Sequence, residues 1–275
     1  MTPTRPQQPA LPERDGLRLA YLDFGGDGPP VLFLHGLAGH AGEWAETAQW
    51  LTGRARVVAL DARGHGGSER NPADVSQRAH VDDVAFVIEQ LALGPVVLVG
   101  QSLGGLTAFL VAAEHPGLVR GLVVGEASPE RDEEAAVEEA EHYLASWPVP
   151  FASREAAVAF FGGPSLRAES WADGLESRED GLWPRFEVAV MSRTLRAAAS
   201  RSHWTEWDSI QCPALVVRAE RGAIAAGEAG AMVARLPGAR LVELSGAGHD
   251  LHLDRPQEWR TAISEFLDSV DAGSA

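Results

Sequence analysis

Val-Val-Leu-Val-Gly-Gln-Ser-Leu-Gly, residues 96–104, joins a short apolar run to a stretch with helical periodicity, residues 103–115. An apolar run of this length bounded by glycine is typical of a buried strand, and the amphipathic stretch predicts a helix. A serine on a tight strand-to-helix turn has strained backbone and needs small residues on either side. Such patterns arise by chance in a chain with 29 glycines, but the flanking strand and helix favour Ser102 as a nucleophile.

Similar apolar runs recur along the chain between amphipathic stretches. They span residues 31–34, 56–60, 95–100, 119–125, 214–218 and 240–244. Continuous runs rich in valine and leucine are typical of strands that are buried on both faces of a parallel sheet. The alternation of strand and helix therefore predicts an α/β fold with a doubly wound, mostly parallel sheet. Ligands of such sheets bind at the carboxyl ends of the strands.

The alternation stops between about residues 129 and 210. This segment starts acidic and helical, contains the proline- and glycine-rich stretches 147–150 and 162–164, and shows no strand-like run. We expect a helical cap, residues 129–210, inserted into a core formed by residues 13–128 and 211–270. Five of the eight tryptophans lie in this segment. We expect most to pack the cap onto the core and some to line a cleft that favours apolar substrates.

Composition narrows the partners and the location. All 23 basic side chains are arginine, against 39 acidic ones, which gives a formal net charge of −16. A surface this acidic repels nucleic acid and anionic membranes, so neither is an expected partner. No apolar run has the length of a membrane span, and residues 1–12 lack the apolar region of a signal peptide, so we expect a cytoplasmic protein. The single cysteine, Cys212, cannot form an internal disulfide and is predicted to be a buried structural thiol. The oligomeric state is not predicted.

Three further motifs extend the pattern around Ser102. His35-Gly36 follows the first apolar run, Asp61-Ala62-Arg63-Gly64-His65-Gly66-Gly67-Ser68 follows the second, and Gly246-Ala247-Gly248-His249 lies near the C-terminus. These three motifs resemble, in order, the oxyanion loop, the D-x-R-G-x-G-x-S segment and the catalytic-histidine loop of the α/β-hydrolase superfamily. Residues 100–104 resemble the nucleophile elbow of the same superfamily. The resemblance covers residues 15–267. It implies a serine hydrolase that needs neither a metal nor an organic cofactor.

The predicted general base is His249. It follows the last strand-like run on a loop of small residues, which would carry the imidazole over the elbow to take the Ser102 proton. His252 is the nearest competitor, but it begins the segment that leads into the last helix, so we interpret it as structural. His35 and His65 match family positions that brace loops, and a structural role is favoured for both.

Acyl transfer also needs donors aimed at the oxyanion that develops on the substrate carbonyl. The backbone N–H of Leu103, directly after the nucleophile, is one expected donor. The family resemblance places the second donor at the backbone N–H of Leu37.

The acid of the triad departs from the family pattern. The family usually carries an aspartate in a G-x-x-D pattern after the strand that follows the cap, but here Gly222 stands at that position. Glu126 ends the run 119–125, where certain haloalkane dehalogenases and the zearalenone lactonases carry their acid. Glu220 lies two residues before Gly222, and its longer side chain could also reach His249. Glu126 is preferred because the acid need only orient the imidazole and stabilise its cation. Glu220, another residue, or no acid at all stay open.

The resemblance and the motifs lead to one main function and two alternatives. The main hypothesis is a hydrolase that cleaves a carboxylic ester or lactone of a small, largely apolar substrate through an acyl-enzyme. A serine at the elbow argues against epoxide hydrolases and haloalkane dehalogenases, whose family members use aspartate there. One alternative is a carbon–carbon bond hydrolase, for which Arg193 or Arg196 of the cap could supply polar groups to the pocket. The other alternative is a weakly catalytic small-molecule receptor.

Overall fold

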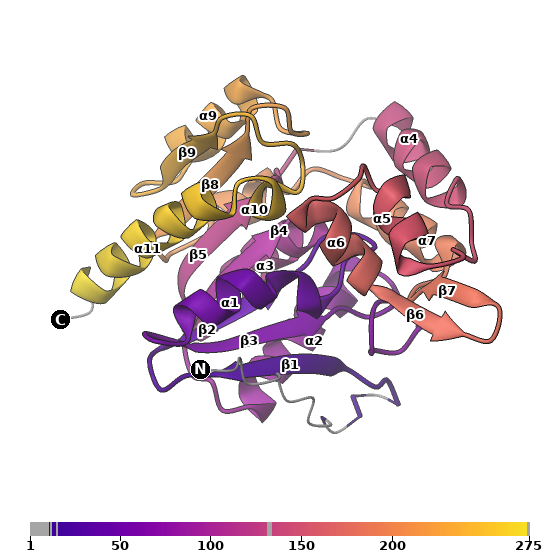
Figure 1. Ribbon diagram of the computed structural model, residues 1–275. Coiled ribbons are helices and arrows are strands. Elements are labelled where there is room, and N and C mark those ends of the chain that lie inside the picture. Colours follow the sequence, from indigo (N-terminus) through magenta and orange to yellow (C-terminus); the bar gives the residue numbers. More distant parts are fainter. Residues whose placement is uncertain (1–10, 12, 15, 131–133, 274–275) are drawn as a thin grey trace.

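The computed structural model describes residues 11, 13, 14, 16–130 and 134–273. Within them, a seven-stranded sheet has the order β1-β3-β2-β4-β5-β8-β9 (Figure 1). Its strands are β1 (Ala20–Gly25), β2 (Pro30–Leu34), β3 (Arg56–Asp61), β4 (Val96–Gln101), β5 (Val119–Gly125), β8 (Ala214–Ala219) and β9 (Arg240–Leu244). All neighbouring strands are parallel except β1, which pairs antiparallel with β3. The predicted α/β fold with a mostly parallel sheet is confirmed.

The six apolar runs of the sequence correspond to β2, β3, β4, β5, β8 and β9. The prediction that all six are buried was wrong for β9, which is the second edge strand and is mostly exposed. The edge strand β1 was missed. Tyr21 packs on one face of the sheet while Leu22 and Phe24 pack on the other, with Asp23 between them. The charged residue and the register irregularity at this point interrupt the apolar run that marks the inner strands.

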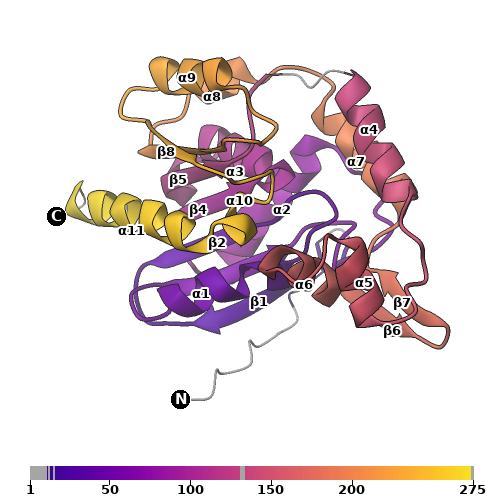
Figure 2. The same cartoon turned by 45° about the horizontal axis from the view of Figure 1, so that its top comes forward.

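Helices cover both faces of the sheet (Figures 1 and 2). One face packs against α2 (Gln77–Gln90), α3 (Leu103–Glu114), α8 (Trp204–Asp208) and α9 (Ala226–Arg235). The other packs against η1 (Ala41–Trp44), α1 (Ala45–Leu51) and α11 (Pro256–Gly273). The short helices η2 (Pro116–Leu118) and α10 (Leu251–Asp254) complete this part of the fold. In the described chain, no helix combines the length and hydropathy needed to cross a bilayer.

The segment between β5 and β8 lies beside the sheet and is mainly helical (Figure 2). It contains α4 (Glu134–Ala145), α5 (Arg154–Phe160), α6 (Leu166–Asp173), α7 (Val188–Ala198) and α8. It also contains a hairpin that sequence analysis missed, formed by β6 (Leu175–Arg178) and β7 (Gly181–Pro184). Each strand has four residues and β6 is mostly polar, so no apolar run marks it. The division into a core and a cap of residues 129–210 stays a prediction.

The five tryptophans of this segment have different surroundings. Trp147 is buried in an aromatic cluster with Phe151, Phe161, Trp171 and Phe186. Trp207 is buried against Phe109 of the core helix α3, so α8 fastens the end of the segment to the sheet layer. Trp183 is stacked under Arg178 on the hairpin, and Trp204 under Arg235 of α9.

Cys212 lies just before β8 and is half-buried rather than fully buried. Burial raises the pKa of its thiol to about 11, so the thiol stays protonated at neutral pH.

Candidate active site

Ser102 occupies a strained turn between β4 and α3. Its backbone has φ 52° and ψ −121°, and its N–H donates to the Gly125 carbonyl of β5 at 2.8 Å. Glycine is required on both sides: a Cβ at Gly100 would lie 2.2 Å from the Gly104 oxygen, and one at Gly104 would lie 2.2 Å from the Leu34 oxygen. A non-glycine residue in this conformation costs of order 1–3 kcal/mol, and such strain clusters at active sites.

His249 lies on the loop between β9 and α10 and lines the same cavity as Ser102. The side-chain amide of Gln101 donates to the His249 carbonyl at 2.9 Å, so the residue before the nucleophile holds the histidine loop in place. The His249 side chain is 44% exposed, which leaves the imidazole open to the cavity.

Glu126 is the first residue after β5 and is fully buried, with φ 49°. Its Oε1 accepts the Ala219 N–H and its Oε2 accepts the Ala223 N–H, both at 2.6 Å. Oε2 also lies 3.4 Å from His249 Nδ1. This is longer than an ideal charge-assisted hydrogen bond. The structure therefore brings Glu126 and His249 together.

Gly222 explains how this carboxylate is accommodated. A Cβ at Gly222 would lie only 2.0 Å from Oε2 of Glu126 and 2.3 Å from its carboxyl carbon. The missing side chain at the usual aspartate position therefore leaves the space that the Glu126 carboxylate occupies.

Glu220 points toward the backbone of the histidine loop. Its carboxylate accepts the Gly246 N–H at 2.6 Å and the Ser245 hydroxyl at 2.9 Å. These two hydrogen bonds, that of Gly246 above all, lower the pKa of Glu220. The side chain is at the surface, so its contacts are those of a carboxylate that braces the loop.

The two predicted oxyanion donors lie against the elbow. Leu37 is inside a turn closed by the Gly39 N–H on the Gly36 carbonyl at 3.1 Å, and a Cβ at Gly36 would lie 3.3 Å from the Ser102 Cβ. Leu103 begins α3, where the first N–H groups have no partner within the helix. Both residues line the cavity.

His35 and His252 make structural contacts. His35 Nε2 accepts the Ala62 N–H at 3.0 Å while Nδ1–H donates to the Gly36 carbonyl at 2.7 Å, so this ring ties the loops after β2 and β3 together. His252 stacks on Trp44 at 4.2 Å between ring centroids, and its Nε2 lies 3.3 Å from the Glu43 carboxylate.

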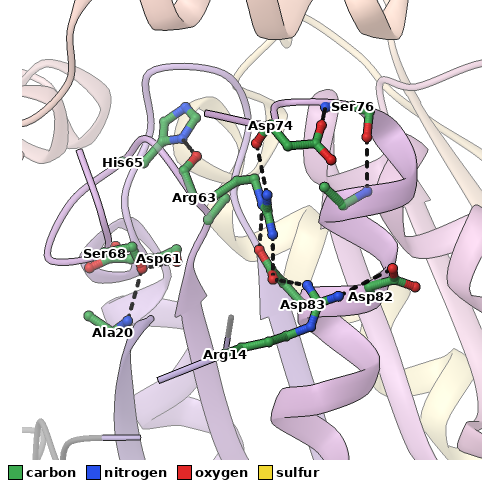
Figure 3. Close-up of polar contacts among 12 residues, drawn as sticks. Arg14, Ala20, Asp61, Arg63, His65, Ser68, Asp74, Ser76, Asp82 and Asp83 are labelled. Carbon is green, nitrogen blue, oxygen red and sulfur yellow. Dashed lines mark hydrogen bonds and ion pairs between the residues drawn. The ribbon is translucent and has the colours of Figure 1, made fainter. Parts of the chain in front are cut away.

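The loop after β3 is held by a network of polar contacts (Figure 3). Arg63 binds Asp83 through two hydrogen bonds of 2.7 Å and also donates to the Asp74 carbonyl at 2.8 Å. His65 Nδ1 is 2.9 Å from the Arg63 carbonyl, and burial holds the pKa of its ring well below the usual value. These residues shape the scaffold beside the site.

A cavity of about 520 Å³ opens in front of Ser102, His249 and Glu126. Much of its wall is apolar and comes from both the core and the segment between β5 and β8, including Leu37, Leu106, Val137, Leu144, Phe161, Leu195 and Ile224. Polar side chains also line it, namely Ser128, Glu130, Tyr143, Arg167, Trp171, His203, Glu228 and Asp250.

Trp171 is the kind of cap tryptophan that the sequence analysis expected at a cleft. The other polar residues of the wall were missed, and the two arginines that were named lie elsewhere. Arg193 donates to the Pro72 and Ala73 carbonyls, and Arg196 forms ion pairs with glutamates of α4. Neither lines the cavity, because the helical phase of α7 directs them to other neighbours. In the part of the chain that the structure describes, the arginine that lines the cavity is Arg167 of α6, which pairs with Asp254 at 3.4 Å. Among the described residues, no group of three or more His, Cys, Asp or Glu side chains is arranged to hold a metal ion.

Comparison with known proteins gives a consistent picture. A family model described as the alpha/beta hydrolase fold matches residues 29–256. The chain is 30% identical over 254 residues to 2-(acetamidomethylene)succinate hydrolase of Mesorhizobium japonicum, covering 89% of this chain and 90% of that protein. It is 33% identical over 261 residues to pimeloyl-[acyl-carrier protein] methyl ester esterase of Chromobacterium violaceum, covering 89% and 96% respectively. The crystal structure of E-2-(acetamidomethylene)succinate hydrolase superposes with a TM-score of 0.87 at 27% identity, covering 95% of this chain and all of that one.

Proposed function

The chain belongs to the α/β-hydrolase fold family, and we propose that it is a serine hydrolase that cleaves a carboxylic ester or lactone of a small, largely apolar substrate. The observation that carries this proposal is the strained Ser102 at a mainly apolar cavity that His249 and the buried Glu126 share with it. The pimeloyl ester esterase among the relatives supports ester chemistry on this scaffold.

The proposed reaction starts with a proton transfer. His249 takes the proton of the Ser102 hydroxyl as the oxygen attacks the substrate carbonyl carbon. The carbonyl electrons move to the oxygen, where the N–H groups of Leu37 and Leu103 stabilise the negative charge. Collapse of this intermediate expels the alcohol, which takes the proton from His249, and leaves an acyl group on Ser102.

Water then completes the cycle by the same steps. His249 takes a proton from the water as it attacks the acyl carbon, and the Ser102 oxygen leaves with that proton while the carboxylic acid is released. Glu126 keeps the imidazole in the required orientation and stabilises its cation. The Ala219 and Ala223 N–H groups hold the carboxylate in place during both halves of the reaction.

A second candidate is hydrolysis of an acylaminomethylene succinate. Two relatives carry such names, the second being (E)-2-((N-methylformamido)methylene)succinate hydrolase of Acinetobacter baylyi, 25% identical over 265 residues. The guanidinium of Arg167 could bind a carboxylate of such a substrate. Glu130, Glu228 and Asp250 line the same cavity, however, and their negative charge favours a neutral substrate.

A fluorophosphonate probe tests the proposal directly. The wild-type protein should be labelled covalently, and Ser102→Ala should abolish the label while keeping the thermal unfolding midpoint. A panel of short p-nitrophenyl esters, lactones, ring-fission products and 2-(acetamidomethylene)succinate then ranks the substrate classes by kcat/KM. A wild-type protein that neither takes the label nor turns over any ester would overturn the hydrolase proposal and favour a small-molecule receptor.

A further inference from the structure

One helix of the segment between β5 and β8 contacts the loop that carries His249. This helix, α6, packs beside α10, which begins two residues after His249 (Figures 1 and 2). The indole N–H of Trp171 on α6 donates to Oδ2 of Asp250 at 3.0 Å. Asp250 directly follows His249 in the chain, so this hydrogen bond holds the neighbour of the proposed general base.

The residue on the other side of His249 is connected to the same helix. The Gly248 N–H donates to Oδ2 of Asp254 at 2.8 Å, and Oδ1 of that carboxylate lies 3.4 Å from Nε of Arg167 on α6. Both side chains of this ion pair are partly exposed, so it contributes less than a buried contact would. The two residues that flank His249 are thus both held from α6, one directly and one through Asp254.

The same helix also contacts the loop that carries Leu37, a proposed oxyanion donor. In that loop, Nδ1 of His40 accepts the Gly42 N–H at 3.1 Å, so the ring carries its proton on Nε2. This Nε2–H donates to the Ser170 carbonyl of α6 at 3.0 Å. Ser170 directly precedes Trp171. One turn of α6 therefore contacts both loops that meet at the nucleophile.

The support from α6 acts on the part of the histidine loop that carries the imidazole. Glu220 braces the first residues of this loop, Ser245 and Gly246, while α6 contacts the residues on either side of His249. The His249 side chain is 44% exposed and its Nδ1 lies 3.4 Å from Glu126, so its orientation depends on the backbone as well as on this carboxylate. A misplacement of about 1 Å at a reacting group can lower a rate about a hundred-fold.

We infer that Trp171 is a positioning residue that acts through Asp250 to place His249 for proton transfer from Ser102. This inference rests on the proposed function, because it assumes that His249 is the general base. Trp171 also lines the cavity, so the helix that faces the proposed substrate is the same helix that holds the base.

Three single substitutions separate the hydrogen bond from packing and from charge. Trp171→Phe removes the donor but keeps an aromatic ring against Trp147 and Phe161, whose ring centroids lie 5.6 and 5.8 Å from that of Trp171. Asp250→Ala removes the acceptor. Asp250→Asn keeps an oxygen acceptor for the indole and removes only the negative charge.

Trp183→Phe is the matched control. The indole N–H of Trp183 also donates to an aspartate, Asp180, at 2.8 Å, but Trp183 lies on β7 and does not line the cavity. The control therefore removes the same kind of hydrogen bond from the same segment of the chain at a place remote from the histidine loop.

Steady-state kinetics on a short p-nitrophenyl ester tests the inference. We expect Trp171→Phe to lower kcat about ten-fold and to change KM less than about three-fold, because an aromatic ring still faces the substrate. Asp250→Ala should lower kcat to a similar extent, and Trp171→Phe/Asp250→Ala no further, since both changes break one hydrogen bond. Asp250→Asn should lose far less than Asp250→Ala, and Trp183→Phe should keep the wild-type kcat. Losses that multiply in the double variant, or an Asp250→Asn variant as slow as Asp250→Ala, would overturn the inference.

NMR of the protein labelled with nitrogen-15 in its histidines separates this inference from the proposed function, because it needs no turnover. His249→Asn identifies the His249 signals. In the wild type the neutral ring should carry its proton on Nδ1, facing Glu126, which gives two well-separated nitrogen shifts. Folded Trp171→Phe and Asp250→Ala should bring these shifts closer together as the second tautomer becomes populated, and Trp183→Phe should not. Failure of wild-type fluorophosphonate labelling with this change retained would overturn only the hydrolase proposal. Unchanged His249 shifts in both folded variants would overturn the inference about Trp171 alone.

Discussion

The ends of β5 and β8 lie side by side in the sheet but differ in what they place beside the histidine loop: a buried carboxylate after β5 and a glycine after β8. After β5, Glu126 places a buried carboxylate 3.4 Å from His249. After β8, Gly222 stands where the family resemblance implies an aspartate, and the nearby Glu220 turns to the loop backbone. The comparison indicates that the position of the carboxylate beside His249 matters more than the strand that carries it. When the residue after β5 supplies the carboxylate, the residue after β8 must be small enough not to clash with it.

Glu126 also shares an unusual backbone conformation with the nucleophile. Ser102 and Glu126 end the neighbouring strands β4 and β5, and both have positive φ, at 52° and 49°. A long side chain in this region is uncommon and costs free energy that the surrounding structure must offset. Glu126 also fastens β8 to β5 through the Ala219 and Ala223 N–H groups. Kinetic tests therefore have to separate its proposed role in catalysis from this structural one.

The largest effect is expected from Glu126→Ala. Removing the carboxylate frees the imidazole to adopt unproductive orientations and withdraws the charge that stabilises its cation, so kcat should fall by about a hundred-fold or more. Steady-state kinetics on a short p-nitrophenyl ester measures the loss, and the thermal unfolding midpoint shows whether the variant is folded. A folded Glu126→Ala variant with near wild-type kcat would refute the assignment of the acid.

Gly222→Ala should have the next largest effect. Its Cβ would lie 2.0 Å from Oε2 of Glu126, so the carboxylate must shift away from His249 or the loop must move. We expect kcat to fall about ten- to a hundred-fold, with a loss of about 1–3 kcal/mol in the free energy of unfolding. Gly227→Ala in α9 is the control, because a Cβ there meets nothing within 4 Å. Equal activity of the two variants would show that the space at Gly222 is not needed.

A double substitution tests whether a carboxylate placed after β8 can replace the one after β5. In Glu126→Ala the space beside Gly222 is vacated, so Gly222→Asp can place a carboxylate near His249 from the other strand. We expect Glu126→Ala/Gly222→Asp to recover kcat by about ten-fold over Glu126→Ala, the remainder being lost to imperfect geometry. Glu126→Ala/Gly222→Ala, which has no carboxylate at either place, should show no recovery.

The sequence predicts the inner part of this molecule better than its edges. The five inner strands are buried and have apolar runs, and the exposed edge strand β9 keeps a weaker one, whereas β1 is interrupted by Asp23 and the four-residue strands β6 and β7 lack that signal. For the site, the elbow around Ser102, the loop of His249 and the glycine at position 222 were all visible. The fit between Gly222 and the Glu126 carboxylate was not, because it depends on the spacing of two strand ends that are far apart in the chain.

The cavity wall was the least predictable part of the site. Arg167 of α6 and His203, which directly precedes α8, line the cavity, and no motif in either segment indicates which side chains face it. Arg193 and Arg196 were plausible from composition, yet the helical phase of α7 directs both to carbonyl and carboxylate partners outside the cavity.

The smallest effect is expected from Glu220→Ala, the other candidate acid. Its carboxylate is at the surface and braces the Ser245–Gly246 backbone, and water can solvate these donors when it is removed. We expect kcat to change less than about three-fold. Hydrogen bonds lower the pKa of Glu220 from 4.5, so its stabilising effect is present above that pH and is lost as the pH falls through its folded pKa. Glu220→Ala should thus unfold at a slightly lower temperature than the wild type at pH 7, and the difference should shrink on acidification below pH 4.5. A large loss of kcat at pH 7 with an unchanged midpoint would instead place the acid at the end of β8.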